Sequence, residues 1–346
     1  MLAFENDYSH GCHPALLQRL AETNLEPLTG YGQDGYTRSA AEKIRDACGC
    51  PEAEVYFIFG GTQTNQLVID TMLPSWGAVL SCETGHIGTH ESGAVEFTGH
   101  KVVTLPAHDG KLDAAEADRY LTDLKENNGY GQLAEPALVY ISFPTEFGTL
   151  YSKEELRALR AVCDRHAIGL YLDGARLGYG LASPACDVTL PELAALCDAF
   201  YIGGTKVGAL CGEAVVFPRH APAHFYASMK QHGAMQAKGR LIGVQFDRLF
   251  TDGLYLDLSR RAIEMAELLK QAVTEAGLRL DPVSPTNQQF AVMTRAQMQW
   301  LQARDVKLLY WDTRPDGNVT VRLTTSWATA PEDIAALGAL LREMPG

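Results

Sequence analysis

The sequence alternates short apolar runs with stretches of helical periodicity, and this alternation restricts the folds open to the chain. The runs that predict strands lie at 54–59, 78–80, 101–105, 137–142, 169–172, 199–202 and 213–217. Helical spacing separates several of them, at 64–73, 152–167 and 189–197. Because such alternation is typical of a parallel sheet covered by helices, we expect an α/β fold with a mostly parallel sheet.

The pattern changes near residue 239. From there the predicted elements mix helices and strands, at 241–250, 255–275, 289–293, 296–305, 307–311, 319–324 and 332–344. The chain has 346 residues, 46% of them hydrophobic, which is enough for one large core and a smaller one. We predict a boundary near residue 248, between a large domain and a smaller C-terminal α+β domain.

Polar groups follow three of the predicted strands. Gly61 and Thr62 come after the first run, Asp173 ends the run at 169–172, and Lys206 lies between two apolar runs. In parallel sheets the ligand site lies outside the carboxyl ends of the strands. We therefore expect one crevice to contain all three groups.

Each group alone also has an ordinary structural interpretation. FGGTQTNQ at 59–66 is either a tight turn or an anion cradle for one phosphate, and it is neither a Walker A loop nor a GxGxxG motif. Asp173 either caps a helix or pairs with a buried cation. Arg176 either stays near Asp173 or binds a substrate carboxylate. Lys206 either reaches solvent or acts as a buried nucleophilic amine.

Together these groups are the parts needed to hold pyridoxal phosphate. The lysine forms a Schiff base, the aspartate keeps the pyridine nitrogen protonated, and the glycine turn takes the phosphate. His86, in HIGTHESG at 86–93, would stack on the ring or handle a proton. The spacing of His86 and His90 also suits zinc, but HExxH is absent and glycines interrupt the segment. We predict no metal, and local loop hydrogen bonding for His90.

Charge and composition exclude several classes of partner. A net charge of -13 and a pI of about 5.2 disfavour nucleic acid. No apolar run reaches the roughly 18 residues of a membrane span, and MLAFENDYSHGCHP lacks the features of a signal peptide. The eight cysteines form no CxxC pair and no zinc-finger spacing, which indicates reduced thiols in a cytoplasmic protein.

Nearly the whole chain resembles the threonine aldolase and β-eliminating lyase group of fold-type I pyridoxal-phosphate enzymes. The resemblance rests on segments in matching order: ENDYSHGCHPALLQRL, YGQDGYT, GGTQTNQ, HIGTHESG, PTEFGTLYSKEELRAL, LDGARLG, YIGGTKVGALCGE, QAKGRLIG and VRLTTSW. It implies an N-terminal segment (1–15) that contributes to the active site, a cofactor-binding large domain (16–248) and a C-terminal small domain (249–346). It also implies a homodimer or homotetramer with shared active sites.

The resemblance implies a role for each matched residue. Lys206 would form the Schiff base, Asp173 would pair with the pyridinium, and His86 would stack on the ring. The phosphate would be bound by Gly61 and Thr62. The carboxylate of the amino-acid substrate would be held by Arg176, Arg322 and Asn6. A site completed across a subunit interface would use Tyr31, Lys238 and Arg240.

One position departs from many bacterial threonine aldolases. Where those enzymes have a loop histidine near the substrate hydroxyl, FPTEFG at 143–148 has Glu146. The base that takes the hydroxyl proton is therefore His86, Glu146 or a water.

The resulting hypothesis is retro-aldol cleavage of L-threonine, L-allo-threonine or a related β-hydroxy-α-amino acid to glycine and an aldehyde. The alternatives are a β-eliminating lyase or dehydratase with the same cofactor, or a protein that only binds the cofactor. A dinucleotide-dependent oxidoreductase would need the GxGxxG motif that this sequence lacks.

Overall fold

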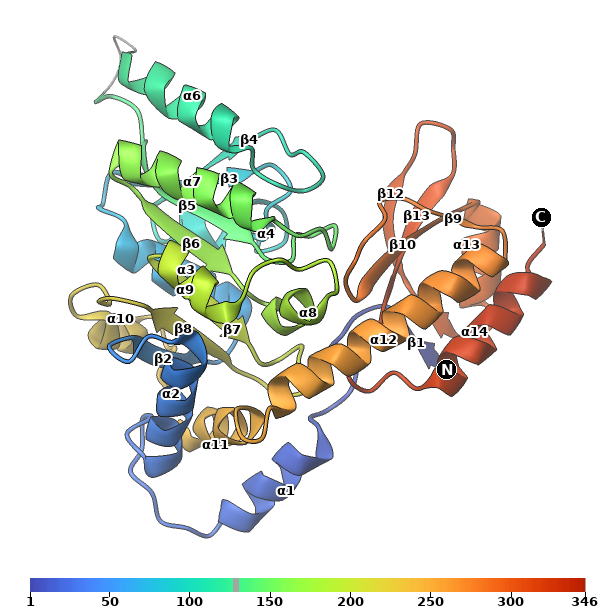
Figure 1. Cartoon of the computed structure of the whole chain (residues 1–346), viewed down its shortest axis with the longest axis horizontal. Helices are drawn as coiled ribbons and strands as arrows, with labels where there is room; N and C mark the ends of the chain where they lie inside the picture. The colour runs from blue at the N-terminus through green and yellow to red at the C-terminus, as the bar shows by residue number, and fades with distance from the viewer. Residues whose placement is uncertain (127–130, 346) are drawn as a thin grey trace.

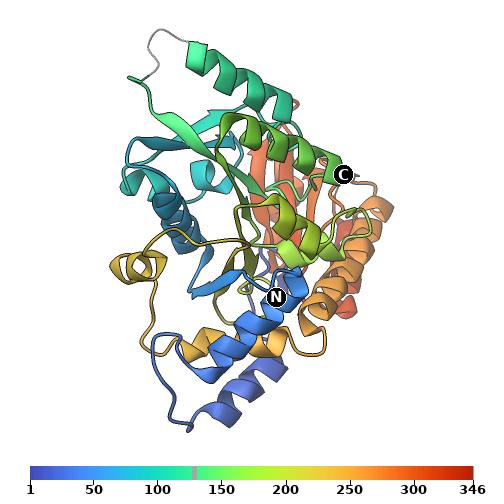
Figure 2. The same cartoon turned by 60° about the vertical axis from the view of Figure 1, so that its left-hand side comes forward.

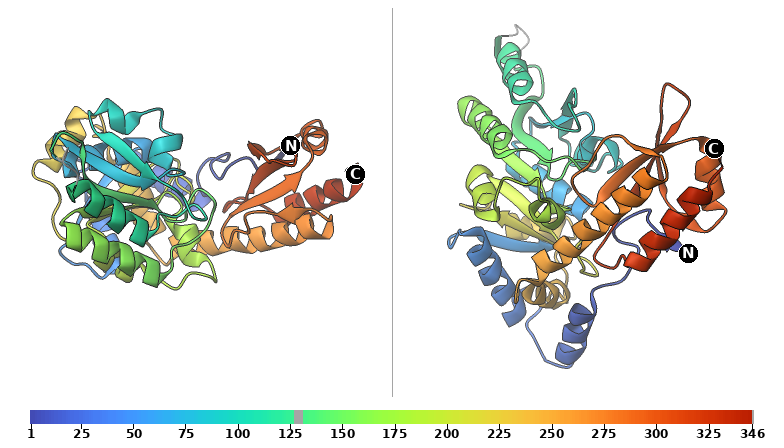
Figure 3. Two further views of the ribbon diagram at one scale, coloured as in Figure 1. Left: turned by 90° about the horizontal axis from the view of Figure 1, so that it is seen from above. Right: turned by 45° about the vertical axis from the view of Figure 1, so that its right-hand side comes forward.

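The computed structural model describes residues 1–126 and 131–345, which form two parts joined by one long helix (Figure 1). Helix α12 (Leu254–Glu275) runs from the larger part to the smaller one, as the view from above also shows (Figure 3). Strand β1 (Leu2–Ala3) pairs in parallel with β11 (Val306–Lys307), so the chain begins in the smaller part. It then crosses to the larger part, where α1 (Pro14–Thr23) begins.

The larger part is built on a seven-stranded sheet in the order β2-β8-β7-β6-β5-β3-β4. Its strands are β2 (Glu54–Ile58), β3 (Gly77–Cys82), β4 (Lys101–Leu105), β5 (Glu135–Ser142), β6 (Gly169–Asp173), β7 (Ala199–Gly203) and β8 (Glu213–Phe217). Strand β8 is antiparallel to both β2 and β7, whereas the other neighbours pair in parallel. The predicted α/β fold with a mostly parallel sheet is confirmed.

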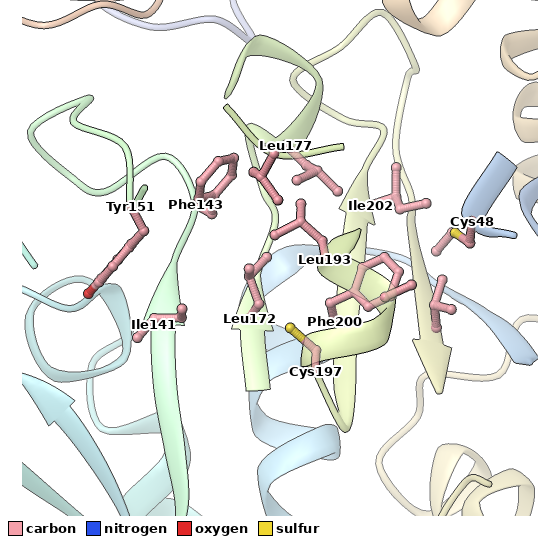
Figure 4. Packing of buried hydrophobic residues seen from close by; sticks show 14 of the residues in the cluster. Cys48, Ile141, Phe143, Tyr151, Leu172, Leu177, Leu193, Cys197, Phe200 and Ile202 are labelled. Atoms are coloured by element: carbon pink, nitrogen blue, oxygen red, sulfur yellow. The ribbon is translucent and has the colours of Figure 1, made fainter. Parts of the chain in front are cut away.

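Helices cover both faces of this sheet (Figure 2). Because successive residues of a strand point to opposite faces, Leu170 and Leu172 pack into one core and Tyr171 into the other. Figure 4 shows the first core, where Leu193 and Phe200 pack beside Leu172. The helices that contribute to it are α1, the first part of α12, α2 (Gly35–Cys48), α6 (Ala114–Glu126), α7 (Lys153–His166), α8 (Leu177–Ala182), α9 (Leu190–Leu196) and α11 (Arg240–Leu249). The helices of the other face are α3 (Gly61–Met72), α4 (His86–Thr89), α5 (Ala94–Phe97) and α10 (Phe225–Gln231).

The N-termini of helices α7 and α3 follow from their local sequences. Helix α7 begins with the predicted capping box, in which Ser152 and Glu155 each bond the other's backbone N–H. Helix α3 begins three residues earlier than expected, because Gly60 in extended conformation serves as its N-cap. Gly61 and Thr62 therefore lie in the first turn of α3 and not in a preceding loop.

The smaller part holds an antiparallel four-stranded sheet in the order β12-β13-β10-β9. Its strands are β9 (Arg279–Leu280), β10 (Gln288–Met293), β12 (Leu309–Thr313) and β13 (Val319–Thr324). One face packs on α12, α13 (Arg295–Gln302) and α14 (Pro331–Glu343) around a separate apolar core. The division into 16–248 and 249–346, whose last residue lies outside the described chain, stays a prediction.

Two further observations concern the environment of the chain. All eight cysteines are free thiols. Among the described helices, no segment has the length and apolar character that crossing a membrane requires.

Candidate active site

Two adjoining cavities, of about 500 and 420 Å³, lie between the carboxyl edge of the large sheet and the smaller part. The first is lined by Gly61, Thr62, Asp173 and Lys206, so the structure brings together the groups that follow three different strands. The second extends to Trp311 and to other residues of the smaller part. Both cavities share a set of lining residues: Tyr8, His86, His90, Glu146, Arg176 and Lys206.

The floor of the first cavity contains the N-terminus of α3. Gly60, the N-cap, has no side chain to form a capping bond, so no capping side chain of the described residues bonds the first N–H groups of the helix. A Cβ added to Gly61 would lie 3.1 Å from the Tyr201 hydroxyl, which leaves little room for a side chain. This turn is a cradle suited to an anion.

Asp173, the last residue of β6, is buried and fully hydrogen-bonded. Its Oδ2 accepts bonds from the Tyr140 hydroxyl (2.6 Å) and Asn65 Nδ2 (2.9 Å), and its Oδ1 accepts one from the Tyr201 hydroxyl (2.5 Å). Burial alone would raise the pKa of Asp173, but the charge of His86 and these bonds outweigh it and lower the pKa. The carboxylate therefore stays ionised while facing the cavity.

Sequence reasoning missed the groups that hold this carboxylate. Tyr140, Tyr171 and Tyr201 lie on the adjacent strands β5, β6 and β7, and all three are fully buried. Tyr171 donates to Asn65 Oδ1 (2.8 Å), which orients the amide whose nitrogen bonds Asp173. A tyrosine inside a continuous apolar run is a usable signal, because a buried hydroxyl needs a partner.

Lys206 lies in the loop between β7 and β8. Burial, and then the charge of Arg176, lowers the pKa of Lys206. The Tyr179 hydroxyl donates to the Lys206 carbonyl (2.5 Å), which fixes the backbone that carries the amine. A buried amine that loses its proton easily is a competent nucleophile toward a carbonyl.

His86 opens the one-turn helix α4, and its Nδ1 lies 2.6 Å from Glu91 Oε1. Glu91 also accepts a bond from Asn65 Nδ2 (2.7 Å), and its second oxygen is buried without a partner. Burial lowers the pKa of His86, but Glu91, Glu146 and Asp173 together raise it above its usual value. Glu91 is therefore a site residue that the sequence did not reveal.

The donor atoms of His86, Glu91 and Asp173 lie within 4.8 Å of one another, a spacing that a metal ion could also use. The bond between His86 Nδ1 and Glu91 Oε1 already occupies one atom of each residue. His90, the other half of the zinc spacing, is not part of this group. The expectation that the site uses no metal stays a prediction.

His90 and Trp311 extend His86 into a stack of three rings. The His86 and His90 rings lie 5.4 Å apart at 16°, and those of His90 and Trp311 lie 6.2 Å apart at 23°. His90 also makes the expected local bond, between its Nδ1 and Thr89 Oγ1 (2.6 Å). Trp311 comes from β12, so the smaller part supports the His86 ring through His90.

Arg176, the N-cap of α8, is buried and bonds Asp7. Its Nε donates to Asp7 Oδ2 (2.7 Å) and its Nη2 to Asp7 Oδ1 (3.1 Å). Arg176 therefore forms its ion pair with Asp7, because the N-terminal segment takes up two nitrogens of the guanidinium. Its Nη1 has no hydrogen-bond partner within the described chain and remains for a ligand.

Arg322 on β13 is the second buried arginine of the cavities. It donates to Gln288 Oε1 (3.0 Å) and to the Glu5 carbonyl (3.4 Å), and its Nε is buried without a partner. No carboxylate of the described residues lies within ion-pair distance of it. Burial and the charge of Arg176 lower the pKa of Arg322 to about 10. Arg176 has a direct carboxylate partner in Asp7 whereas Arg322 has none among the described residues, so the pair of arginines suits a substrate carboxylate.

Glu146 and Asn6 reach the same space from two loops. Glu146 is buried, lines both cavities, and accepts one long bond, from the Ser142 hydroxyl at 3.4 Å. Asn6 lines the second cavity, but its Oδ1 accepts bonds from Tyr8 N and Ser9 Oγ. Glu146 therefore has more unused hydrogen-bonding capacity for a ligand than Asn6 has.

Tyr31, Lys238 and Arg240 line neither of these cavities within one chain. Tyr31 is about half exposed and lines a separate small cavity with Tyr226. The Arg240 guanidinium donates to the backbone carbonyls of Thr23 and Glu26, and Lys238 is exposed. Their predicted role across a subunit interface stays a prediction.

The residues of the first cavity suit pyridoxal phosphate. An anion cradle, a buried carboxylate kept ionised, and a partly buried amine of lowered pKa match its phosphate, its pyridinium and its aldehyde. The second cavity, with its two arginines, adjoins the amine and suits an amino-acid carboxylate.

Comparison with known proteins agrees with this chemistry. A low specificity L-threonine aldolase from a Pseudomonas strain is 29% identical over 343 residues, which cover 98% of this chain and 96% of the relative. The enzyme of the same name from Pseudomonas aeruginosa is 28% identical, with coverage of 99% and 98%.

Solved structures extend the comparison. A threonine aldolase from Leishmania major is 41% identical, with a TM-score of 0.94 over 99% of both chains. A mutant aspartate aminotransferase from Thermus thermophilus, at 17% identity and a TM-score of 0.72 over 99% of this chain and 96% of the other, shares the fold. Residues 7–296 match the family model described as beta-eliminating lyase. Because that match covers most of the chain, this protein belongs to the beta-eliminating lyase family and is a pyridoxal-phosphate-dependent lyase of fold type I.

Proposed function

We propose that this protein cleaves L-threonine, L-allo-threonine or a related β-hydroxy-α-amino acid to glycine and an aldehyde. The observation that carries the proposal is a cavity in which a partly buried lysine lies between an anion cradle and two buried arginines. The two Pseudomonas relatives and the Leishmania major structure are all named threonine aldolases, which supports the same reaction.

The first cavity holds the cofactor. Pyridoxal phosphate, when bound, accepts the electron pair of the bond that breaks at the substrate Cα. Lys206 would hold it through the side-chain amine, and Asp173 would pair with its pyridine nitrogen. The N–H groups at Gly61 and Thr62 would bind its phosphate, and His86, backed by His90, would lie beside its ring.

The second cavity holds the amino acid. Arg322 and the free Nη1 of Arg176 bind its carboxylate, with Asn6 at the edge of the site. Two fixed contacts orient the substrate so that one bond at Cα is held in the geometry for cleavage. Glu146 accepts the proton of the β-hydroxyl, because its carboxyl is buried, faces both cavities and has one long hydrogen bond. His86 and a water are the alternative acceptors.

The site is completed in a homodimer or homotetramer in the cytoplasm. Support comes from exposed apolar side chains near the cofactor cavity and near the Tyr31 cavity: Phe59, Leu210, Tyr31, Tyr226 and Leu241. A second subunit that covers them would bring Tyr31, Lys238 and Arg240 to the site of its partner.

The test is an assay of purified holoprotein with L-threonine, L-allo-threonine, D-threonine and L-serine, with aldehyde and glycine measured separately. We expect equal amounts of aldehyde and glycine from the first two substrates. Lys206→Ala should lose this activity and the yellow colour of the bound cofactor, while Lys270→Ala on the outer surface of α12 should keep both. Formation of a keto acid in place of aldehyde and glycine would contradict the proposal.

A further inference from the structure

Glu213 is a buried acid at the active-site edge that the reaction described above does not use. It is the first residue of β8, and because β8 runs against its neighbours, it begins at the edge where β2, β6 and β7 end. Its exposed fraction is 4%, and it lines the same cavity as Lys206 and Asp173.

The Glu213 carboxyl closes the loop that carries Lys206. Its Oε2 accepts a bond from Gly204 N (3.0 Å) and its Oε1 accepts one from Thr205 Oγ1 (2.8 Å), so it binds the two residues before the lysine. Thr205 Oγ1 in turn accepts a bond from Gly212 N (3.1 Å). Both ends of the loop are thereby tied to one carboxyl group.

The two ends of this loop, at Gly204 and Gly212, are tightly packed. A Cβ added to Gly204 would lie 2.7 Å from the Gly212 carbonyl oxygen and 2.7 Å from the Phe246 ring. If the Glu213 carboxyl moves or loses a hydrogen bond, the backbone at Gly204 and Thr205 must therefore move with it, because the surrounding atoms leave no space for another adjustment.

The electrostatic surroundings link the carboxyl to the lysine. Burial raises the pKa of Glu213 to about 8, while the Thr205 hydrogen bond and the charge of Lys206 oppose the rise. The titratable groups around Glu213 come from the Lys206 loop, β6, β7 and α12: Lys206, Cys211, Tyr171, Asp173, Tyr201 and Tyr255. The Tyr255 hydroxyl donates to the Gly203 carbonyl (3.0 Å), so it does not compete for the carboxyl.

We propose that Glu213 is a positioning residue for Lys206 and that its carboxyl sets the pH at which the lysine nitrogen loses its proton. The inference rests on the proposed role of Lys206 as the residue that binds the cofactor. A serine or glutamine could close the loop equally well, but a carboxyl can also change charge beside a cationic nitrogen. Two such groups titrate as a coupled pair, in which ionised Glu213 favours the protonated nitrogen.

The test follows the visible absorption of the holoprotein against pH, a readout that needs no turnover. Glu213→Gln keeps the size of the side chain and one acceptor oxygen but removes the charge. We expect the midpoint of the lysine-linked absorption change to fall by roughly one pH unit or more, because the protonated nitrogen loses a nearby anion. Glu54→Gln, which changes the first residue of β2 at the far end of that strand, should leave the midpoint in place.

A second pair of variants tests the link while keeping the carboxyl. Thr205→Val removes the hydroxyl that stabilises ionised Glu213, so the carboxyl ionises at a higher pH and the midpoint shifts down less than in Glu213→Gln. Thr205→Ser keeps the hydroxyl and should match the unmodified protein. This pair also decides the matter if Glu213→Gln does not fold.

The outcomes separate this inference from the proposed function. A yellow holoprotein whose midpoint is the same in Glu213→Gln, or in Thr205→Val when the first variant does not fold, would overturn the inference alone. An unmodified protein that forms no visible band with pyridoxal phosphate would overturn the proposed function and this inference with it.

Discussion

Asp7 and Arg176 form a buried two-point ion pair that joins distant parts of the chain. Arg176 Nε and Nη2 bond the two Asp7 oxygens at 2.7 and 3.1 Å, and the two side chains are 8% and 0% exposed. Asn287 Nδ2 from the smaller part donates to Asp7 Oδ2 (2.9 Å). The N-terminal segment, the larger part and the smaller part therefore meet at a single carboxylate, next to the proposed substrate site.

We expect Asp7→Asn to destabilise the fold and to weaken substrate binding. Removing one partner leaves the Arg176 charge buried and unpaired, which costs about 3–5 kcal/mol in comparable cases. Urea unfolding at neutral pH measures the loss. Asp257→Asn is the control, because its pair with Arg260 is exposed on α12 and should change the stability by less than about 1 kcal/mol.

The same variant should alter the dependence of stability on pH. Burial alone would raise the pKa of Asp7, but the charges of Arg176 and Lys206 lower it below its usual value. A lowered pKa in the folded state gives stability that is present above the unfolded value and is lost as the pH falls through the folded one. The unmodified protein should lose this contribution below about pH 4, and Asp7→Asn should show a flatter curve there. Parallel curves would contradict the assignment.

The network around Asp173 predicts a graded effect on cofactor binding. Asp173→Asn removes the anion, and we expect the apparent affinity for pyridoxal phosphate to fall by about 100-fold or more. Tyr201→Phe removes one of the donors to Asp173, and we expect a loss of roughly tenfold. Titration of the visible absorption measures both. Tyr151→Phe, whose hydroxyl accepts a bond from Leu112 N outside the cavities, is the control and should bind normally.

The sequence predicts the framework of the site because topology alone brings certain groups together. Strands β2, β6 and β7 run in the same direction, so Gly61, Asp173 and Lys206, which follow or end them, share an edge. The spacing of apolar residues along the sequence is enough to predict where the strands lie. Strands β4 and β13, for example, span the predicted residues. No tertiary contact is needed for this part of the argument.

The contacts that tune the site depend on pairs far apart in the chain. Asp7 and Arg176 are 169 residues apart, so their bond was not visible from spacing, which suggested the i,i+3 neighbour Asp173 instead. Glu213 was missed because a charged residue at the start of a strand is common at protein surfaces. The buried tyrosines Tyr140 and Tyr201 were the strongest neglected signal, since an apolar run that includes a hydroxyl requires an acceptor.

A glycine beside Asp173 gives a prediction about stability. A Cβ at Gly174 would lie 1.9 Å from the backbone carbonyl oxygen of Tyr201, which cannot move without breaking the sheet edge. We expect Gly174→Ala to cost about 3 kcal/mol or more and to impair cofactor binding, because Asp173 would shift as well. Gly11→Ala is the control, since no atom lies within 4 Å of an added Cβ there. Equal melting temperatures for the two variants would contradict the packing argument.

Glu146 and His86 can be separated as acceptors of the substrate hydroxyl proton. If Glu146 takes the proton, Glu146→Gln should lower kcat by about 10²–10⁴-fold while the cofactor spectrum stays normal. His86→Phe keeps a ring beside His90 but cannot accept a proton, and it leaves the buried Glu91 without its imidazole partner, so it should slow turnover less than Glu146→Gln does.

Measurements of kcat with L-threonine and of the visible spectrum for both variants decide between the two residues. Ser142→Ala removes a long bond to Glu146 and a 3.2 Å contact with the Tyr140 hydroxyl, and it should lower kcat far less than Glu146→Gln does. The opposite pattern, a large loss in His86→Phe and near-normal turnover in Glu146→Gln, would assign the proton transfer to His86. In that case the short bond between His86 Nδ1 and Glu91 would be the feature that holds the imidazole for this role.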